Sequence, residues 1–116
     1  MEKQEIKSRY EEMVKTIEAA NMYDGRGTYD LYVCEKCGYQ KITTYKDKGV
    51  TPFMLKCKNC DGWMQHTNTY KSVPDGTPVE EFVRPSLDVV YKLNDAQLDH
   101  LFNGGLFLES ELNKYK

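Results

Sequence analysis

The chain lacks a long apolar segment. None of its 116 residues lies in a hydrophobic run that approaches the roughly 20 residues needed to cross a bilayer. The N-terminal stretch MEKQEIKSRYEEMVK is charged throughout and has no apolar core of the kind a signal peptide carries. These absences predict a cytoplasmic protein without a membrane partner. In that compartment cysteines stay reduced, so stable disulfides are not expected.

Signatures of catalysis are also scarce. The chain has two histidines, His66 and His100, and shows no serine–histidine–acid pattern, phosphate-cradling glycine loop or second cluster of metal ligands. Each histidine is expected to be solvent-facing or packed, since four cysteines already complete a ligand set. The acidic residues are scattered over predicted helix faces. We therefore expect a protein that is not an enzyme and has no catalytic residues.

Positive charge is scarce outside the middle of the chain. The net charge is −2, yet residues 31–72 hold seven lysines against three acidic residues. Residues 1–24 hold six acidic and four basic residues, and residues 73–116 hold eight acidic and four basic ones. The central excess is smaller than that of a strongly basic nucleic-acid-binding face. A basic centre between acidic ends gives a mild electrostatic indication about partners.

Composition and length predict one folded α+β domain spanning residues 1–116. The chain is 40% hydrophobic and 29% charged, which is typical of globular proteins. We expect an N-terminal helix in residues 1–24, a cysteine-containing β region in residues 28–73 and a helical C-terminal extension in residues 79–116. A chain of this size buries a modest core, so a structural metal would help to stabilise it.

The N-terminal segment has the periodicity of an amphipathic helix. Apolar residues recur at steps of three and four, at Ile6, Tyr10, Met13, Val14, Ile17 and Ala20. The sequence DGRG at 24–27 is a turn signal after it. The apolar stripe either packs on the rest of the domain or mediates self-association through residues 6–20. About two heptads are too few to assign a coiled coil.

From Thr28 the apolar pattern changes to a period of two. It predicts four strands, in TYDLYVC, YQKITTYK, TPFMLKC and GWMQHTNTYKSV, and PDGTP at 74–78 is expected to end the sheet. Two short helices are expected beyond it, in LDVVYKL after a candidate cap at Ser86 and in AQLDHLF after Asn94 or Asp95. The following LFLE is expected to form a short edge strand or a docked tail.

All four cysteines occur in two Cys-x-x-Cys pairs, Cys34 with Cys37 and Cys57 with Cys60. Nineteen residues separate the pairs, a spacing typical of zinc sites. Four thiolates in a tetrahedron suit Zn²⁺ and leave no open position for water or substrate. Iron in the same ligand set, redox cycling and disulfides are the alternatives. Redox cycling is disfavoured because it expects a Cys-x-x-Cys pair at a helix N-terminus, whereas both pairs lie on strand turns.

The segment CEKCG…CKNCDG, flanked by strands from Thr28 to Ser72, resembles a four-cysteine zinc ribbon. The resemblance implies a small antiparallel ribbon with structural Zn²⁺, joined here to an N-terminal amphipathic helix and short C-terminal helices. It implies no particular activity. The order TPFMLKCKNCDGWMQHTNTY, EFVRPS and HLFNGGLFLES also resembles small phage or prophage zinc-ribbon proteins of uncharacterised function. Those are expected to carry a Trp-Tyr-Arg-Pro-type stretch, and this chain has Phe82-Val83-Arg84-Pro85 instead.

Two functions are compatible with these features, a protein-interaction module and a nucleic-acid-binding ribbon. The candidate surface for either partner comprises Lys36, Lys41, Lys46, Lys58 and Trp63. Lysines contact phosphates and exposed aromatic rings stack on bases. Strand parity places Tyr39, Lys41, Thr43 and Tyr45 on one face of the sheet. The nucleic-acid hypothesis loses most of its surface if the N-terminal helix covers that face.

Overall fold

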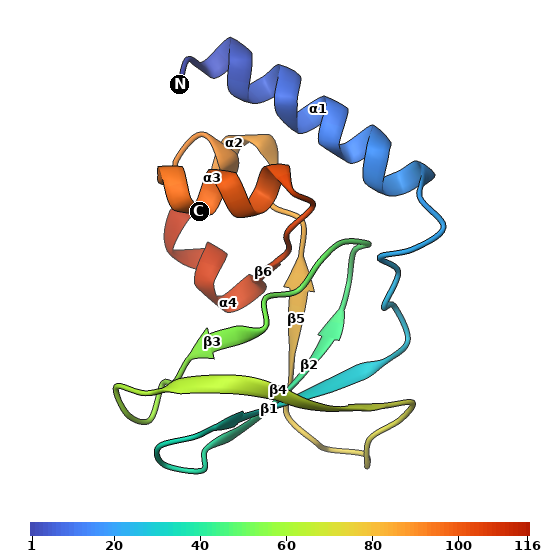
Figure 1. The fold of residues 1–116 in the computed structure, drawn as a ribbon, viewed down its shortest axis with the longest axis vertical. Helices are drawn as coiled ribbons and strands as arrows, with labels where there is room; N and C mark the ends of the chain where they lie inside the picture. Colours follow the sequence, from blue (N-terminus) through green and yellow to red (C-terminus); the bar gives the residue numbers. More distant parts are fainter.

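The computed structural model describes residues 1–116 and has an α+β fold, a curled mixed sheet with four α-helices (Figure 1). The helices are α1 (Lys3–Ala19), α2 (Leu87–Val90), α3 (Asp95–Phe102) and α4 (Glu109–Leu112), and a 3₁₀ turn follows at Asn113–Tyr115. The strands are β1 (Tyr29–Cys34), β2 (Gln40–Tyr45), β3 (Met54–Lys56), β4 (Trp63–Tyr70), β5 (Val79–Val83) and β6 (Phe107–Leu108). No helix is both long enough and apolar enough to span a membrane.

The sheet has the strand order β3-β4-β1-β2-β5-β6, and every pair is antiparallel except β2 with β5. The four strands predicted around the cysteines are present. The prediction that residues 74–78 end the sheet is wrong, because β5 and β6 follow it. Residues 79–83 had been expected to belong to a helical extension. Their strand conformation arises from pairing with the otherwise free edge of β2, a non-local contact that local periodicity does not report.

Strands β5 and β6 separate two hydrophobic cores. Phe82 of β5 and Leu108 of β6 face the sheet core, while their chain neighbours Val83 and Phe107 face a helical core. This division follows from the alternation of side chains along a strand. The helical core is completed by α1, α2, α3 and α4, and the sheet core extends to the cysteine turns. The C-terminal segment therefore joins the helices to the region of the cysteine turns.

Helix α1 packs on α2 and α3 at the end of the molecule away from the cysteine turns (Figure 1). Its stripe residues Ile6, Met13 and Ile17 are buried in the helical core. The hydroxyl of Tyr10 donates a hydrogen bond to the carbonyl oxygen of Pro85, 2.7 Å away. The interpretation that the stripe packs on the rest of the domain is confirmed. Tyr10 and Val14 are partly buried against the same core, so the three buried side chains of the stripe are not available for self-association.

The face of β2 that the nucleic-acid hypothesis needs is covered. Lys41 and Thr43 are buried, and Tyr45 packs against Phe82 of the sheet core. Phe82 of the neighbouring strand β5 and Leu106 of the C-terminal segment belong to the core on this face, whereas the buried residues of α1 belong to the helical core. Lys41 and Thr43 are therefore not accessible on this face.

The predicted caps of the C-terminal helices had different outcomes. Asn94 caps α3, because its side chain accepts a bond from the Gln97 N–H at 2.9 Å while the Gln97 side chain accepts from the Asn94 N–H at 2.8 Å. Ser86 holds the N-cap position of α2 without a side-chain capping bond. Gly104 follows α3 with a φ of +89°, as expected for the glycine after a helix. The expected edge strand in LFLE is β6.

Candidate metal centre

Each cysteine pair lies on a tight turn between two antiparallel strands. Cys34 ends β1, where its N–H donates to the Tyr39 carbonyl at 2.8 Å and its carbonyl accepts from the Gly38 N–H at 3.0 Å. Cys57 follows β3, and its N–H donates to the Gly62 carbonyl at 3.0 Å. The central strands β1 and β4 pair directly, so the two turns are held side by side.

The two glycines after these turns serve different purposes. Gly38 has a φ of +78°, a backbone conformation that other residues rarely adopt. Glycine is required at position 62 for steric reasons. A Cβ there would lie 2.9 Å from the Lys36 Cβ and 3.3 Å from the sulfurs of Cys34 and Cys60. A side chain at position 62 would therefore press on the sulfur cluster.

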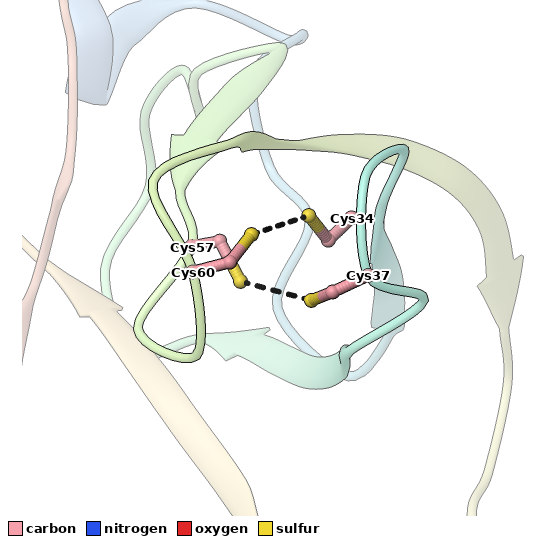
Figure 2. Close-up of side chains that lie close together, drawn as sticks. All are labelled: Cys34, Cys37, Cys57 and Cys60. Carbon is pink, nitrogen blue, oxygen red and sulfur yellow. Dashed lines mark hydrogen bonds between the residues drawn. The ribbon is translucent and has the colours of Figure 1, made fainter.

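The four sulfurs point toward one common centre (Figure 2). They all lie within 4.8 Å of one another, with 3.5 Å between Cys34 and Cys60 and 3.7 Å between Cys37 and Cys57. Four sulfurs bound tetrahedrally at about 2.3 Å from Zn²⁺ would be about 3.8 Å apart. A disulfide requires about 2.05 Å, and all four cysteines are free. The geometry fits a metal ion and not a pair of disulfides.

Nearby N–H groups stabilise negative charge on the sulfurs. The side-chain amide of Asn59, 3.5 Å from the Cys37 sulfur, lowers the pKa of Cys37 to about 6. The backbone N–H of Cys37 lowers the pKa of Cys34 in the same way. The backbone N–H of Asn59 also donates to the Cys57 sulfur at 3.3 Å. The turns therefore provide the donors that thiolate ligands need.

The raised pKa of Cys60 shows why four adjacent thiolates need a cation. The Gly62 N–H, 3.2 Å from the Cys60 sulfur, favours its thiolate. Desolvation and the hydrogen bonds with the other three cysteines oppose it, and together they raise the pKa of Cys60 to about 12. Four adjacent sulfurs do not all ionise unaided, because like charges repel at this distance. A bound divalent cation would remove that penalty, so the residues fit the zinc that their spacing predicts.

The cluster contains sulfur donors alone. Cys34 and Cys57 are buried and belong to the sheet core, Cys60 is half-buried and Cys37 is exposed. No histidine or carboxylate joins the group. Soft thiolates in a closed tetrahedron are typical of structural zinc. Four cysteines are thus positioned to bind a metal ion, and they suggest a structural zinc site.

Both histidines lie away from the sulfurs, in packed or half-exposed positions. The Nε2 of His66 on β4 lies 3.0 Å from an Asp30 carboxylate oxygen, which also accepts from the Thr69 hydroxyl at 2.8 Å. The Nε2 of His100 lies 2.9 Å from the Leu106 carbonyl oxygen. The buried carboxylate of Asp30 is thus satisfied across β1 and β4, and this contact was not predicted.

The residues of the predicted partner surface differ in exposure and in charge pairing. Lys36 forms an ion pair with Asp61, and Lys58 lies 3.5 Å from Glu80. Lys41 has a side chain that is only 5% exposed and does not belong to any surface. The other four residues are exposed; among them Lys46 has no acidic partner, and Trp63 has 52% of its area accessible.

Sequence reasoning missed two residues that matter for this region. Asn59 in the second turn donates hydrogen bonds to the sulfurs of Cys57 and Cys37. Its position between Cys57 and Cys60 in the sequence could have indicated this role. Glu80 of β5 binds Lys41, Lys58 and the Ser110 hydroxyl, the last at 2.6 Å. No local pattern indicates Glu80, because its partners come from three separate parts of the chain.

Comparison of the chain with protein-family models, curated proteins and solved structures finds no match. The class of the protein therefore rests on its own fold and site. These define an α+β protein with a four-cysteine cluster positioned to bind a metal.

Proposed function

We propose that this is a small zinc protein whose four-cysteine site is structural and which acts as a non-enzymatic protein-interaction module. The observation that carries the zinc assignment is the closed set of four sulfurs with tetrahedral spacing. Cys34, Cys37, Cys57 and Cys60 would hold the ion. Bound there, zinc would supply a cross-link and charge neutralisation and no open coordination position for water. The antiparallel pairing of β1 with β2 and β4, and of β3 with β4, supports the zinc-ribbon part of the proposal.

A structural ion has a clear task in this fold. Strand β3 has only three residues and contacts β4 alone within the sheet. Such a short hairpin is marginally stable by itself. A cross-link from the β3–β4 turn to the β1–β2 turn would fix β3 on the sheet core, where Leu55 is buried. The surface formed by β3 and β4 would then depend on the ion.

The proposed interaction role is supported by large apolar side chains exposed in this hairpin. Phe53 is 87% exposed, Trp63 is 52% exposed and Met54 is 44% exposed. Single exposed apolar residues are ordinary, but the strand register places Met54 and Trp63 on the same face of the hairpin, and Phe53 adjoins Met54 in the chain. Aromatic residues and methionine are also enriched in protein interfaces. The β3–β4 hairpin is therefore the surface on which we place partner binding.

The structure favours a protein partner over nucleic acid. Of the lysines considered for phosphate contact, Lys41 is buried, and Lys36 and Lys58 each lie beside a carboxylate. Carboxylates next to lysines weaken attraction to phosphate. The aromatic residues Tyr32 and Tyr45 lie in or against the sheet core and are not free to stack on bases.

Three measurements test the proposal. Elemental analysis of the purified protein should give one zinc per chain, and an iron content in its place would reject the zinc assignment. Affinity capture should identify a protein that also binds after both components are purified, and that binding should be lost in the Phe53→Ser/Trp63→Ser variant. Tyr70→Ser, which changes an exposed aromatic residue elsewhere on β4, is the matched control. Tight, steeply salt-dependent binding of single-stranded oligonucleotides through Trp63 would favour nucleic acid.

A further inference from the structure

Strand β3 is an outer edge of the sheet, and its outward backbone groups are unpaired. The His66 N–H donates to the Phe53 carbonyl at 3.2 Å, and the Cys57 N–H donates to the Gly62 carbonyl at 3.0 Å. Antiparallel pairing alternates, so the backbone groups of Met54 and Lys56 between these points face away from β4. No other element bonds to them. Two residues thus offer free N–H and C=O groups at the sheet edge.

A groove runs beside this free edge. Its volume is about 480 Å³, and its walls come from β3 on one side and from α3 with the start of α4 on the other. Its apolar lining includes Leu55, Phe82, Leu106 and Leu108 of the sheet core, together with Met54 and Trp63. More than half of the lining residues are hydrophobic. The groove therefore suits apolar side chains of a ligand better than phosphate groups.

The groove also carries two charges without partners. Lys56 and Glu111 both line it, and neither lies within ion-pair distance of an opposite charge, unlike Lys36 and Lys58 on the neighbouring turns. A ligand that places a carboxylate near Lys56 would therefore gain a favourable interaction that the chain itself does not supply. Charge, free backbone groups and apolar lining occur together along one short strand.

We propose that this groove binds an extended peptide segment of a partner protein, which adds as a strand to β3. Main-chain groups of the peptide would pair with those of Met54 and Lys56, alternate apolar side chains would enter the groove, and one carboxylate would face Lys56. A helical partner would leave the free groups of β3 unsatisfied, because its own backbone bonds are internal. The proposal rests on the proposed interaction function and specifies its partner.

The first test selects from a displayed library of random linear peptides on the full-length, zinc-loaded protein. We expect enriched sequences with apolar residues at alternate positions and an aspartate or glutamate at a fixed place among them. Their affinity is measured by fluorescence anisotropy with synthetic peptides, and Trp63, the single tryptophan, gives an independent signal. Failure to enrich any peptide, or enrichment of peptides that bind as helices, would overturn the proposal.

Backbone and charge variants give the sharper test. Met54→Pro removes one outward N–H and leaves the bonds to β4 intact, so peptide affinity should fall about tenfold or more while zinc content and circular dichroism are unchanged. Lys56→Glu should weaken binding and regain it with a peptide whose carboxylate is replaced by lysine. Lys46→Glu, with the same charge change at another exposed lysine, should bind normally. Equal affinity for all three variants would overturn the proposal.

The result also separates this proposal from the broader one. If a purified partner protein binds the wild type and Met54→Pro equally but not Phe53→Ser/Trp63→Ser, the interaction function stands and strand addition is wrong. If β3 pairs with a second copy of the chain, light scattering will show a dimer that Met54→Pro abolishes, which also overturns the peptide proposal.

Discussion

The ammonium nitrogen of Lys41 lies 2.8 Å from a carboxylate oxygen of Glu80, and 5% of the Lys41 side chain is exposed. This pair joins β2 to β5, the only parallel contact between named strands. Glu80 also receives a hydrogen bond from Ser110 of α4. Partial burial opposes ionisation of Glu80, but its bonds to Lys41 and Ser110 outweigh that effect and lower its pKa. One carboxylate thus links the sheet to the C-terminal helices.

Removing Glu80 should cost more stability than removing the pair. Glu80→Ala leaves the Lys41 ammonium buried without a partner, and we expect a loss of about 3 kcal/mol in the free energy of unfolding. Lys41→Met/Glu80→Leu should recover most of that loss, because apolar side chains can replace a buried ion pair. Urea unfolding measures both, with Glu81→Ala as a neighbouring control. A double variant less stable than Glu80→Ala would contradict the assignment.

Removal of the metal should unfold the region around the cysteine turns. Structural zinc contributes apparent free energies on the order of 10 kcal/mol in small domains. Cys37→Ser, Cys60→Ser or a strong chelator should therefore abolish the cooperative thermal transition and change the circular dichroism of the sheet. Readdition of Zn²⁺ after chelation should restore the wild type and not the variants. Unchanged melting after complete metal removal would show that the site is not structural.

Gly62→Ala should weaken metal binding through contact alone. The new Cβ would lie 3.3 Å from the sulfurs of Cys34 and Cys60, so the ligands must shift. Changes next to metal ligands typically cost 10- to 100-fold in affinity, and we expect a loss of about tenfold in competition with a chelator. Gly76→Ala is the control for zinc affinity alone, because its Cβ meets nothing within 4 Å and lies away from the sulfurs; its φ of +83° predicts a loss of stability there but no loss of zinc affinity. Equal zinc affinity of both variants would contradict the close packing at Gly62.

Alkaline pH should destabilise the protein through its buried tyrosines. Burial raises the pKa of Tyr32 from 10.0 to about 12, and its hydroxyl donates to the Pro52 carbonyl at 2.7 Å. A raised folded-state pKa gives a contribution that is complete below pH 10 and is lost as the pH rises toward 12. Tyr32→Phe should reduce the pH dependence of urea unfolding in this window and cost about 1 kcal/mol at neutral pH. Tyr70→Phe is the control, and an unaltered slope in Tyr32→Phe would contradict the prediction.

Helix α1 should contribute to folding and not to self-association. Ile17 is buried and packs near Gly104, where an added Cβ would approach its Cδ1 to 2.6 Å. Ile17→Ala should cost about 2–4 kcal/mol, while Met22→Ala, which changes an exposed residue, should cost little. Light scattering of the wild type should give one chain mass at all concentrations. A concentration-dependent mass that Ile17→Ala removes would restore the self-association hypothesis.

Several features could be predicted from the sequence because they depend on local patterns. The period of the apolar residues in α1 and the alternation in β1 to β4 locate these elements, and the Asn94 cap needs only a neighbouring Gln97. The two Cys-x-x-Cys pairs and their separation specify a four-sulfur site, because each turn directs both of its sulfurs to one side. Local geometry is sufficient for all of these.

The sequence by itself determined the ligand set and most of the elements near it. Tertiary structure alone decided that β5 extends the sheet, that Lys41 is buried against Glu80 and that the edge of β3 is free beside a groove. Each of these depends on segments distant in the chain that meet only after folding. Burial of a charge depends on its partner, and exposure of a sheet edge depends on what covers it. Local periodicity in the sequence therefore predicts neither.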